Sequence, residues 1–266
     1  MVRLYVSIER LGDAELGLLP DEIGYLTRVR RLGAGDAVEV FDGRGGRWPG
    51  TLQPGREKLA LGSRVQDRSR QRFSFELWQG LSKGDRMEWV IQKATELGAS
   101  RIVPLACERA VVRLSPARAV AKLQRWRKIA QEAARQSGRA DVPEVAEVAS
   151  LSGLTAWPQA GRQAVLMYER EDRRALQTYL AGVAPGSHLA LVVGPEGGFD
   201  PAEVESVSAA GIPLMGLGDR MLRTETAAVA VCVLALAASG GMGGSEALTG
   251  HGSREGAGSG AVGSSP

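Results

Sequence analysis

The sequence predicts an α/β protein in two parts: a small, mostly β N-terminal domain and a larger domain with a parallel sheet. Residues 1–70 contain short β-like runs, glycines and turn signals, and their only helix-like stretch is "DEIGYLTRVRRLG". From residue 71 onward, apolar strands alternate with longer helical segments, an order that favours a parallel sheet. Residues 240–266 are rich in Gly and Ser, and we expect them to form a disordered tail.

The N-terminal domain contains a predicted hairpin. In "GDAVEVFDGRGGRWPGTLQ", one strand lies on each side of an Asp42-Gly43 turn that holds further glycines. A chain of 266 residues can form one large domain or two modest ones. The change of pattern near residues 67–71 favours two, at residues 1–70 and 71–239.

The second domain is predicted to open with a strand. In "RFSFELWQG", Phe73, Phe75 and Leu77 alternate on one face. A "SKGD" turn then leads into a helix that ends at Gly98, and the strand "RIVPL" follows. The apolar face of this helix comprises Met87, Val90, Ile91, Ala94 and Leu97.

A long helix is predicted from Ser115-Pro116 to Gln136, because Ser can cap a helix and Pro suits its first position. Its apolar side comprises Val120, Leu123, Trp126, Ala130 and Ala133. Another side carries Arg118, Lys122, Arg125 and Arg139. Such a row of charges is more often a solvated helix face than a nucleic-acid contact. The apolar runs "AVLMY", "LALVV" and "IPLMGLG" then predict three further strands with helices between them.

Composition narrows the class of protein. The formal net charge is +3, and arginines cluster within residues 28–72 and 109–139, which suggests a polyanionic partner. No segment reaches the roughly 18 uninterrupted apolar residues of a membrane span, so we expect a soluble, cytoplasmic protein. Cys107 and Cys232 lack metal-ligand spacing and only two His are present, so we expect reduced structural thiols and no metal site.

The stretch "LVVGPEGGFDPAEVE" runs from an apolar strand through glycines into a helix. Gly197 and Gly198 leave backbone N–H groups bare, and "DPAE" from Asp200 forms a capping box. The turn fits neither phosphate-binding pattern, GxxxxGK[ST] or GxGxxG, and Glu196 and Asp200 would repel a phosphate. The sequence therefore predicts a site for a cationic or polar ligand, although a plain strand-to-helix turn would also explain Asp200-Pro201.

A second unusual stretch is "LGDRMLRTETAAVAVCVLALAAS". It leads from a polar loop into a helix that is apolar all round. Thr224 can cap this helix, and Glu225 in its first turn complements the positive end of the helix dipole. A helix without a polar stripe must be buried on most sides. We therefore expect a helix in the core or at a subunit interface. Charged residues at the rim of a buried helix are costly, so we expect "RTET" to have a function.

These two stretches, in this order, resemble the SPOUT class of methyltransferases. Four motifs narrow the resemblance: "KGDRMEWVIQKATELGASRIVPLACERAVV", "RWRKIAQEAARQSGRADVPEV", "GPEGGF" and "LGDRMLRTETA". From Arg3 to about Leu236, the chain resembles the bacterial 16S rRNA (uracil(1498)-N(3))-methyltransferase family. The resemblance implies a PUA-like β-barrel at residues 1–70, a SPOUT methyltransferase domain with a C-terminal trefoil knot at residues 71–239, and a homodimer.

The family binds S-adenosylmethionine in the knot, so the resemblance implies this ligand for the two unusual stretches. Its sulfonium is positively charged, which suits an acidic turn better than a phosphate does. The cofactor-binding residues implied by the resemblance are Met167, Tyr168, Gly194, Glu196, Gly197, Gly198, Leu217, Gly218, Leu222, Arg223 and Thr226.

The resemblance also implies a reaction, methylation at N3 of uridine 1498 of 16S rRNA in the small ribosomal subunit. Uracil N3 lies on the Watson–Crick edge and carries a proton, so the base must be unpaired and the proton must leave. We assign stabilisation of the developing negative charge to Arg109 or Arg223, and deprotonation to Glu225, Glu108 or solvent. The competing structural roles are helix-dipole capping for Glu225 and a surface salt bridge for Arg109.

RNA contacts are expected from the N-terminal domain and from the long helix. Where the family often has an "H-x-x-x-VLR" segment, this chain has "YLTRVRR". The RNA-binding residues that we predict are Arg28, Arg30, Arg31, Arg135 and Arg139.

Three alternatives stay open. The chain could be a SPOUT methyltransferase for another RNA, or a non-catalytic RNA-binding module with the same fold. It could also be a nucleotide- or NAD-binding α/β protein that uses "GPEGG" as its phosphate turn. Two observations argue against this last alternative: the "GPEGG" loop lacks the GxGxxG pattern, and it lies late in the chain.

Overall fold

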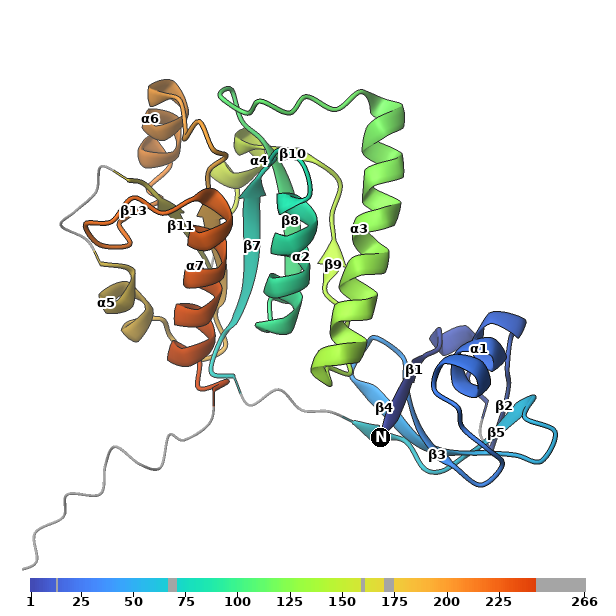
Figure 1. The fold of residues 1–266 in the computed structure, drawn as a ribbon. Coiled ribbons are helices and arrows are strands. Elements are labelled where there is room, and N and C mark those ends of the chain that lie inside the picture. Colours follow the sequence, from blue (N-terminus) through green and yellow to red (C-terminus); the bar gives the residue numbers. More distant parts are fainter. Residues whose placement is uncertain (13, 67–70, 159–160, 170–174, 243–266) are drawn as a thin grey trace, which may run out of the picture.

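The structure is a computed structural model that describes residues 1–242, apart from residues 13, 67–70, 159–160 and 170–174. Most of the tail expected from residue 240 lies outside the described residues. The described strands form two separate sheets, one within residues 2–66 and one within residues 74–215. Figure 1 shows the N-terminal sheet beside one end of α3 (Pro116–Ser137), while the second sheet lies among the other helices.

The N-terminal sheet has the strand order β1-β3-β4-β5-β2, and β6 pairs with β4. Its strands are β1 (Val2–Tyr5), β2 (Glu15–Gly17), β3 (Ala37–Phe41), β4 (Gly46–Leu52), β5 (Lys58–Leu61) and β6 (Val65–Gln66). The predicted hairpin is confirmed as β3 and β4, and Gly43 in its turn has a positive φ of 73°. Among the described residues, the pairings run from β1 to β2 without joining these two ends.

Helix α1 (Pro20–Gly24) covers this sheet and continues into a π-helical turn at Tyr25–Val29. This is the helix-like stretch noted in the sequence. Leu26 from the turn is fully buried in the apolar core of the sheet. The turn therefore holds the neighbouring arginines, Arg28, Arg30 and Arg31, at the exposed rim of the N-terminal sheet.

The second sheet is parallel throughout, as predicted, with the order β10-β8-β7-β12-β11-β13 and β9 beside β8. Its strands are β7 (Ser74–Gly80), β8 (Arg101–Ala106), β9 (Glu144–Val145), β10 (Ala149–Ser150), β11 (Arg162–Met167), β12 (His188–Val193) and β13 (Leu214–Met215). Because all strands run the same way, their carboxyl ends meet at one edge.

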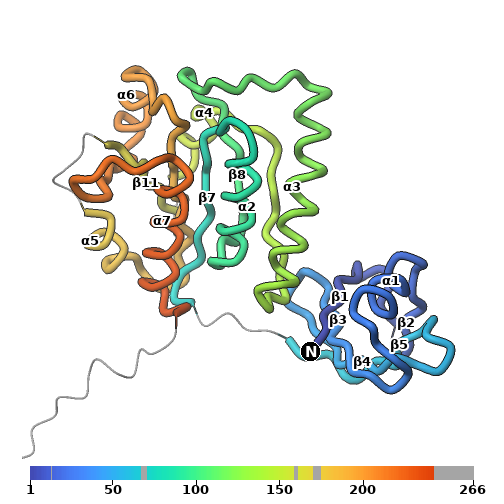
Figure 2. Tube along the Cα trace, viewed as in Figure 1, coloured from blue at the N-terminus to red at the C-terminus, as the bar shows by residue number. Residues whose placement is uncertain are grey.

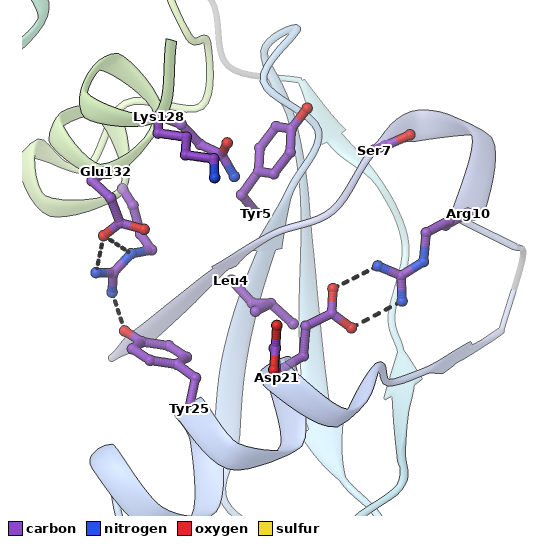
Figure 3. A pocket seen from close by; sticks show the side chains of 11 residues that line it. Leu4, Tyr5, Ser7, Arg10, Asp21, Tyr25, Lys128 and Glu132 are labelled. Carbon is purple, nitrogen blue, oxygen red and sulfur yellow. Dashed lines mark hydrogen bonds and ion pairs between the residues drawn. The ribbon is translucent and has the colours of Figure 1, made fainter. Parts of the chain in front are cut away.

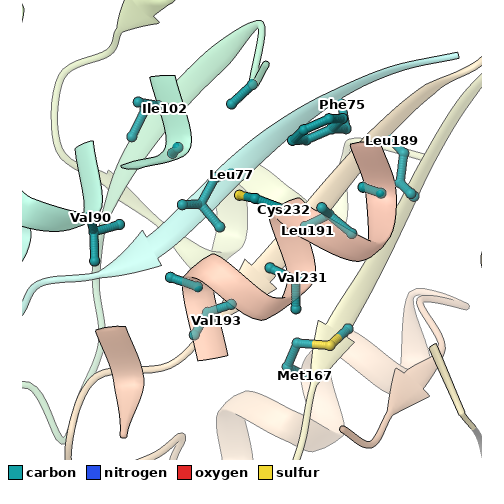
Figure 4. Close-up of a cluster of buried hydrophobic side chains, with 14 of the residues drawn as sticks. Phe75, Leu77, Val90, Ile102, Met167, Leu189, Leu191, Val193, Val231 and Cys232 are labelled. Atoms are coloured by element: carbon teal, nitrogen blue, oxygen red, sulfur yellow. The ribbon is translucent and has the colours of Figure 1, made fainter. Parts of the chain in front are cut away.

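Helices cover both faces of this sheet (Figures 1 and 2). The apolar cluster on one face includes residues of α2 (Arg86–Glu96), α3, α5 (Leu176–Ala181) and α7 (Thr224–Ala238). The cluster on the other face includes residues of α4 (Leu151–Thr155) and α6 (Pro201–Ala209). Successive strand residues point to opposite faces, so Leu77 and Leu191 join the first cluster while Trp78 and Val192 join the second. Figure 4 shows α7 lying across the strands of the first face.

The predicted helix faces are largely confirmed. Met87, Val90, Ile91 and Ala94 of α2 are all buried. On α3, Trp126, Ala130 and Ala133 are buried, but Val120 is 58% exposed, so its place on the apolar side was wrong. Helix α3 has 22 residues and its neighbour α2 has 11, so α2 can cover only about half of α3.

Arg3 of β1 links the N-terminal sheet to α3. Its Nη1 donates to the carbonyl oxygens of Ala134, Arg135 and Arg139 at 3.2, 3.3 and 2.9 Å, and its Nε donates to Glu39 at 2.6 Å. The last carbonyls of a helix have no partners within the helix. The buried guanidinium therefore caps α3 from the other sheet. Two backbone hydrogen bonds between residues 43–45 and 140–142 support the same contact.

Arg3→Met is expected to lower the free energy of unfolding by about 2–4 kcal/mol, because it leaves several carbonyls without their charged donor and removes the nearer of the two arginines that pair with Glu39. Chemical denaturation measures this loss. The matched control is Lys58→Met, which breaks an ion pair with Glu15 whose two side chains are both 60% exposed. Its effect should stay at about 1 kcal/mol or less. Equal effects of the two variants would contradict a capping role for Arg3.

Candidate active site

A cavity of about 780 Å³ lies at the carboxyl edge of the parallel sheet. It is bounded by the ends of β11, β12 and β13 and by the first residues of α7. The two stretches singled out in the sequence form opposite sides of it: the glycine loop, residues 194–198, and the arginine loop, residues 217–223. This volume is within the usual range for small-molecule and cofactor sites.

The structure brings most of the predicted cofactor residues together. Gly197 and Thr226 do not line the cavity: a Cβ on Gly197 would lie 2.7 Å from the carbonyl oxygen of Arg109, and Thr226 is exposed on α7. The predicted residues that do line it are Met167, Tyr168, Gly194, Glu196, Gly198, Leu217, Gly218, Leu222 and Arg223.

Both loops contain a glycine in a backbone conformation that other residues rarely adopt. Gly198 has φ +68° and donates its N–H to the carbonyl oxygen of Pro195 at 3.0 Å, which closes a tight turn. Gly218 has φ +90°, and no atom of the described residues lies within 4 Å of where its Cβ would be. A bound molecule can therefore approach the backbone of both loops closely.

Glu196 and Arg86 form the principal ion pair of the cavity. A carboxylate oxygen of Glu196 accepts from the Lys83 amide at 3.0 Å and from Arg86 Nη1 at 2.7 Å. Burial opposes ionisation, but these hydrogen bonds outweigh it and keep the pKa of Glu196 below its ordinary value. Arg86 Nε also lies 3.9 Å from Glu225 Oε1, so this guanidinium bridges the glycine loop and α7.

Sequence reasoning missed Arg86. The signal was available, because "SKGDR" follows directly after the end of β7 and so had to lie at the carboxyl edge of the sheet.

The predicted catalytic residues are divided between two places. Arg223 and Glu225 line the cavity, and Arg223 has no ion pair within the described ranges. Glu225 Oε2 is buried and has no hydrogen-bond partner there either. Arg109 lies outside the cavity lining and pairs with Asp200 at 3.3 Å, and Glu108 is exposed nearby. Glu225 therefore lines the cavity with one carboxylate oxygen near Arg86 and the other buried without a partner among the described residues.

Thr224 has a different role from the predicted one. Arg223 is the cap residue of α7, and Thr224 is the first helical residue. The Thr224 hydroxyl donates to the carbonyl oxygen of Gly194 at 2.5 Å, because it is buried against the glycine loop instead of facing the free N–H groups of the helix. The sequence could not show this long-range contact.

A second cavity, about 620 Å³, lies between α3 and the N-terminal sheet (Figure 3). At its edge, Tyr25 accepts hydrogen bonds from Arg30 Nε, at 2.8 Å, and from Arg135 Nη1. The two guanidinium carbons lie 5.4 and 4.7 Å from the centre of its ring. Tyr25 thus contacts arginines from both places where RNA contacts were predicted, Arg30 in the N-terminal region and Arg135 on α3.

The five arginines differ in exposure. Arg28, Arg30 and Arg31 are exposed, and Arg31 has an unusual positive φ of 59°. Arg139 is largely buried, with hydrogen bonds to Asp141 and to the carbonyl oxygen of Thr95. These contacts give Arg139 a structural role. Its RNA-binding role stays a prediction.

Cys107 and Cys232 are free and buried, and burial raises the pKa of each thiol to about 12. Over the described ranges, no cluster of three or more His, Cys, Asp or Glu side chains could hold a metal ion. No helix in those ranges has both the length and the apolar character needed to cross a membrane.

The fold and the loops at the sheet edge define a class of protein, the RNA methyltransferases. A family model described as an RNA methyltransferase domain matches residues 69–236, and one described as an RNA methyltransferase PUA domain matches residues 18–61. A Neisseria gonorrhoeae ribosomal RNA small subunit methyltransferase E, solved bound to S-adenosyl methionine, is similar with a TM-score of 0.77 and 29% identity. That similarity covers 89% of this chain and 97% of the other.

Three proteins named ribosomal RNA small subunit methyltransferase E are similar in sequence. The Synechocystis protein is 35% identical, over 85% of this chain and 74% of its own length. The Mycobacterium bovis protein is 34% identical, over 86% and 89%. The Bacillus subtilis protein is 44% identical, over 56% of this chain, and the match spans only 59% of that relative. The chain belongs to the ribosomal RNA small subunit methyltransferase E family, which confirms the family resemblance seen in the sequence.

Proposed function

We propose that this protein transfers the methyl group of S-adenosylmethionine to N3 of a uridine in 16S rRNA, uridine 1498 by family resemblance. The observation that carries the proposal is the cavity between the glycine and arginine loops, in a chain of a family with a relative solved bound to this cofactor. The small ribosomal subunit as substrate would place the reaction in the cytoplasm.

The residues of the cavity fit this cofactor. The charged side chains lining it carry a net charge of −1, which suits a positive sulfonium; they are Arg86, Glu169, Glu196, Asp219, Arg220, Arg223 and Glu225. Gly198 and Gly218 leave the backbone of both loops open to close approach. When bound, S-adenosylmethionine supplies an electrophilic methyl group on sulfur.

The chain's own residues then have three tasks. The two loops hold and orient the methyl donor, and in-line placement supplies much of the rate. Glu225 takes the proton from N3 of the uracil; its Oε2 is buried and unpartnered within the described ranges, so the carboxylate has to turn toward the base. The Arg223 guanidinium, which has no ion pair among the described residues, stabilises the negative charge that develops on the ring oxygens. Arg109 would need to leave Asp200 to share this task.

We also propose that the chain folds into two domains. Residues 1–70 form a PUA-like, RNA-binding barrel and residues 71–239 form a SPOUT domain with a trefoil knot. The PUA match at residues 18–61 supports the first, and the separation of the two sheets between Gln66 and Ser74 supports the boundary.

A homodimer is part of the proposal as well. Met221 of the arginine loop is 85% exposed at the rim of the cavity, and a second copy of the chain would cover it. Analytical ultracentrifugation tests this, because a monomer at micromolar concentration would exclude it.

Incubation with labelled S-adenosylmethionine and small ribosomal subunits lacking the modification tests the function. A label at N3 of one uridine supports the proposal. A label on another atom or RNA would keep the methyltransferase and overturn the target. RNA binding without transfer would favour the non-catalytic module, and thermal stabilisation by NAD but not by S-adenosylmethionine would favour the dinucleotide alternative.

Replacing Arg28, Arg30 and Arg31 together with glutamine is expected to weaken binding to the rRNA and to make it less dependent on salt. If each contacts one phosphate, the slope of log affinity against log salt should fall by about 2 in magnitude, since each contact to a single strand contributes about 0.7. Filter binding at several salt concentrations measures the slope.

The control for this variant is a second set of three basic residues, all on α3. It comprises Arg118, Lys122 and Arg125. Lys122 and Arg125 pair with Glu88 of α2, and the sequence pattern favours a solvated face for this set. Their replacement by glutamine should leave the slope unchanged. The same fall in both variants would mean that net charge, and not the N-terminal rim, determines RNA affinity.

A further inference from the structure

The last residues of β7 carry a fully buried amide. Gln79 is 0% exposed and does not line the cavity. Its Nε2 donates to Thr224 Oγ1 at 2.9 Å and to the carbonyl oxygen of Gly80 at 3.1 Å, and the carbonyl oxygen of Gly194 lies 3.5 Å away. This nitrogen therefore faces three oxygens from three different segments.

Only one orientation of the amide satisfies these neighbours. The Thr224 hydroxyl gives its hydrogen to the Gly194 carbonyl, so all three oxygens around Gln79 act as acceptors. Gln79 Oε1 points the other way and has no partner among the described residues. A buried, unpartnered oxygen is unfavourable for stability. The hydrogen bonds of Nε2 therefore have to offset the cost of the buried Oε1.

The three acceptors belong to the segments that build the cavity. Gly194 begins the glycine loop, Thr224 follows the arginine loop, and Gly80 ends β7, the strand paired with β12. The backbones also touch directly, because a Cβ on Gly80 would lie 2.3 Å from Pro195 N. A change at Gln79 is therefore expected to alter the positions of both loops.

We propose that Gln79 is a positioning residue that sets the spacing of the glycine and arginine loops through Thr224. The inference rests on the proposed function for the identity of the ligand, S-adenosylmethionine. The link itself is a property of the protein without ligand.

Gln79→Glu tests the link with almost no change in shape, because it replaces the donating nitrogen with an oxygen that faces other acceptors. We expect the Kd for S-adenosylmethionine, measured by calorimetry, to rise about ten-fold or more. Thr224→Val should have a similar effect, while Thr224→Ser, which keeps the hydroxyl, should stay within about two-fold of the wild type. Wild-type affinity in Gln79→Glu would overturn the proposal.

The double variant Gln79→Glu with Thr224→Val tests whether the two residues act as one unit. Coupled residues give non-additive effects, so the Kd should exceed that of the worse single variant by no more than about two-fold. A loss equal to the product of the single losses would overturn the link.

Thr95→Val is the matched control. Thr95 is equally buried, and its hydroxyl donates to the carbonyl oxygen of Ile91 at 2.7 Å within α2, away from the cavity. It should lower the melting temperature and leave the Kd unchanged. An increase in Kd equal to that of Gln79→Glu would show that general loss of stability explains both.

Hydrogen exchange without ligand gives a second readout. Gln79→Glu should speed amide exchange in both the glycine loop and the arginine loop, and Thr95→Val in neither. Unchanged exchange in either loop would overturn the positioning role. If the wild-type protein binds no S-adenosylmethionine, the proposed function fails, and the exchange data still decide whether Gln79 links the loops.

Discussion

Replacement of Gly80 by alanine is expected to weaken binding of S-adenosylmethionine about 100-fold, because a displacement of about 1 Å in a binding site can cost that much. The new Cβ would lie 2.3 Å from Pro195 N, 2.6 Å from Pro195 Cδ and 2.7 Å from the carbonyl carbon of Gly194. Two of these atoms are backbone and one belongs to a rigid ring, so no side chain can rotate away. The glycine loop must move, and calorimetry measures the consequence.

Gly80→Ala should also lower the free energy of unfolding by about 1–3 kcal/mol, as overpacking does in a dense core. The control is Gly17→Ala, also within a strand, where a Cβ would meet no atom of the described residues within 4 Å. It should leave both affinity and stability near the wild type. Unchanged affinity in Gly80→Ala would show that the glycine loop does not contribute to binding of S-adenosylmethionine.

The strands and helices of the second domain could be predicted because their apolar patterns reflect burial. Phe73, Phe75 and Leu77 alternate in the sequence, and all three join one apolar cluster. The two-residue strands β9 and β10 carry no such pattern. The parallel pairing of β1 with β3 was also beyond prediction, because it joins segments more than 30 residues apart without a local signal.

The site could be predicted only in part. Strand ends that meet at one edge bring the glycine and arginine loops together, as the family resemblance implied. Gln79 was missed because it looks like any polar residue in a strand, and its role depends on Thr224, far away in the chain. The pairing of Tyr25 with Arg135 depends equally on how the N-terminal sheet meets α3.

Glu225→Gln is expected to lower the rate of methyl transfer about 100-fold or more, because general bases contribute about 10²–10⁴-fold. The amide keeps the size of the side chain but cannot take the proton from N3. In the proposed reaction Glu225 is the base; it lines the cavity, and one of its oxygens has no partner among the described residues. The Kd for S-adenosylmethionine should rise much less than the rate falls, because Glu225 supplies only one of the four negative charges that line the cavity.

Single-turnover rates on small subunits that lack the modification separate this role from a structural one. Glu225 also lies in the first turn of α7, where a carboxylate contributes about 0.3–1 kcal/mol through the helix dipole. If that were its only role, Glu225→Gln would lower stability slightly and leave the rate unchanged. Asp219→Asn, an acid on the arginine loop of the same cavity, controls for the loss of one negative charge. An unchanged rate in Glu225→Gln would mean that Glu108 or solvent accepts the proton. Equal losses of rate in both variants would mean that the loss of one negative charge in the cavity explains the effect.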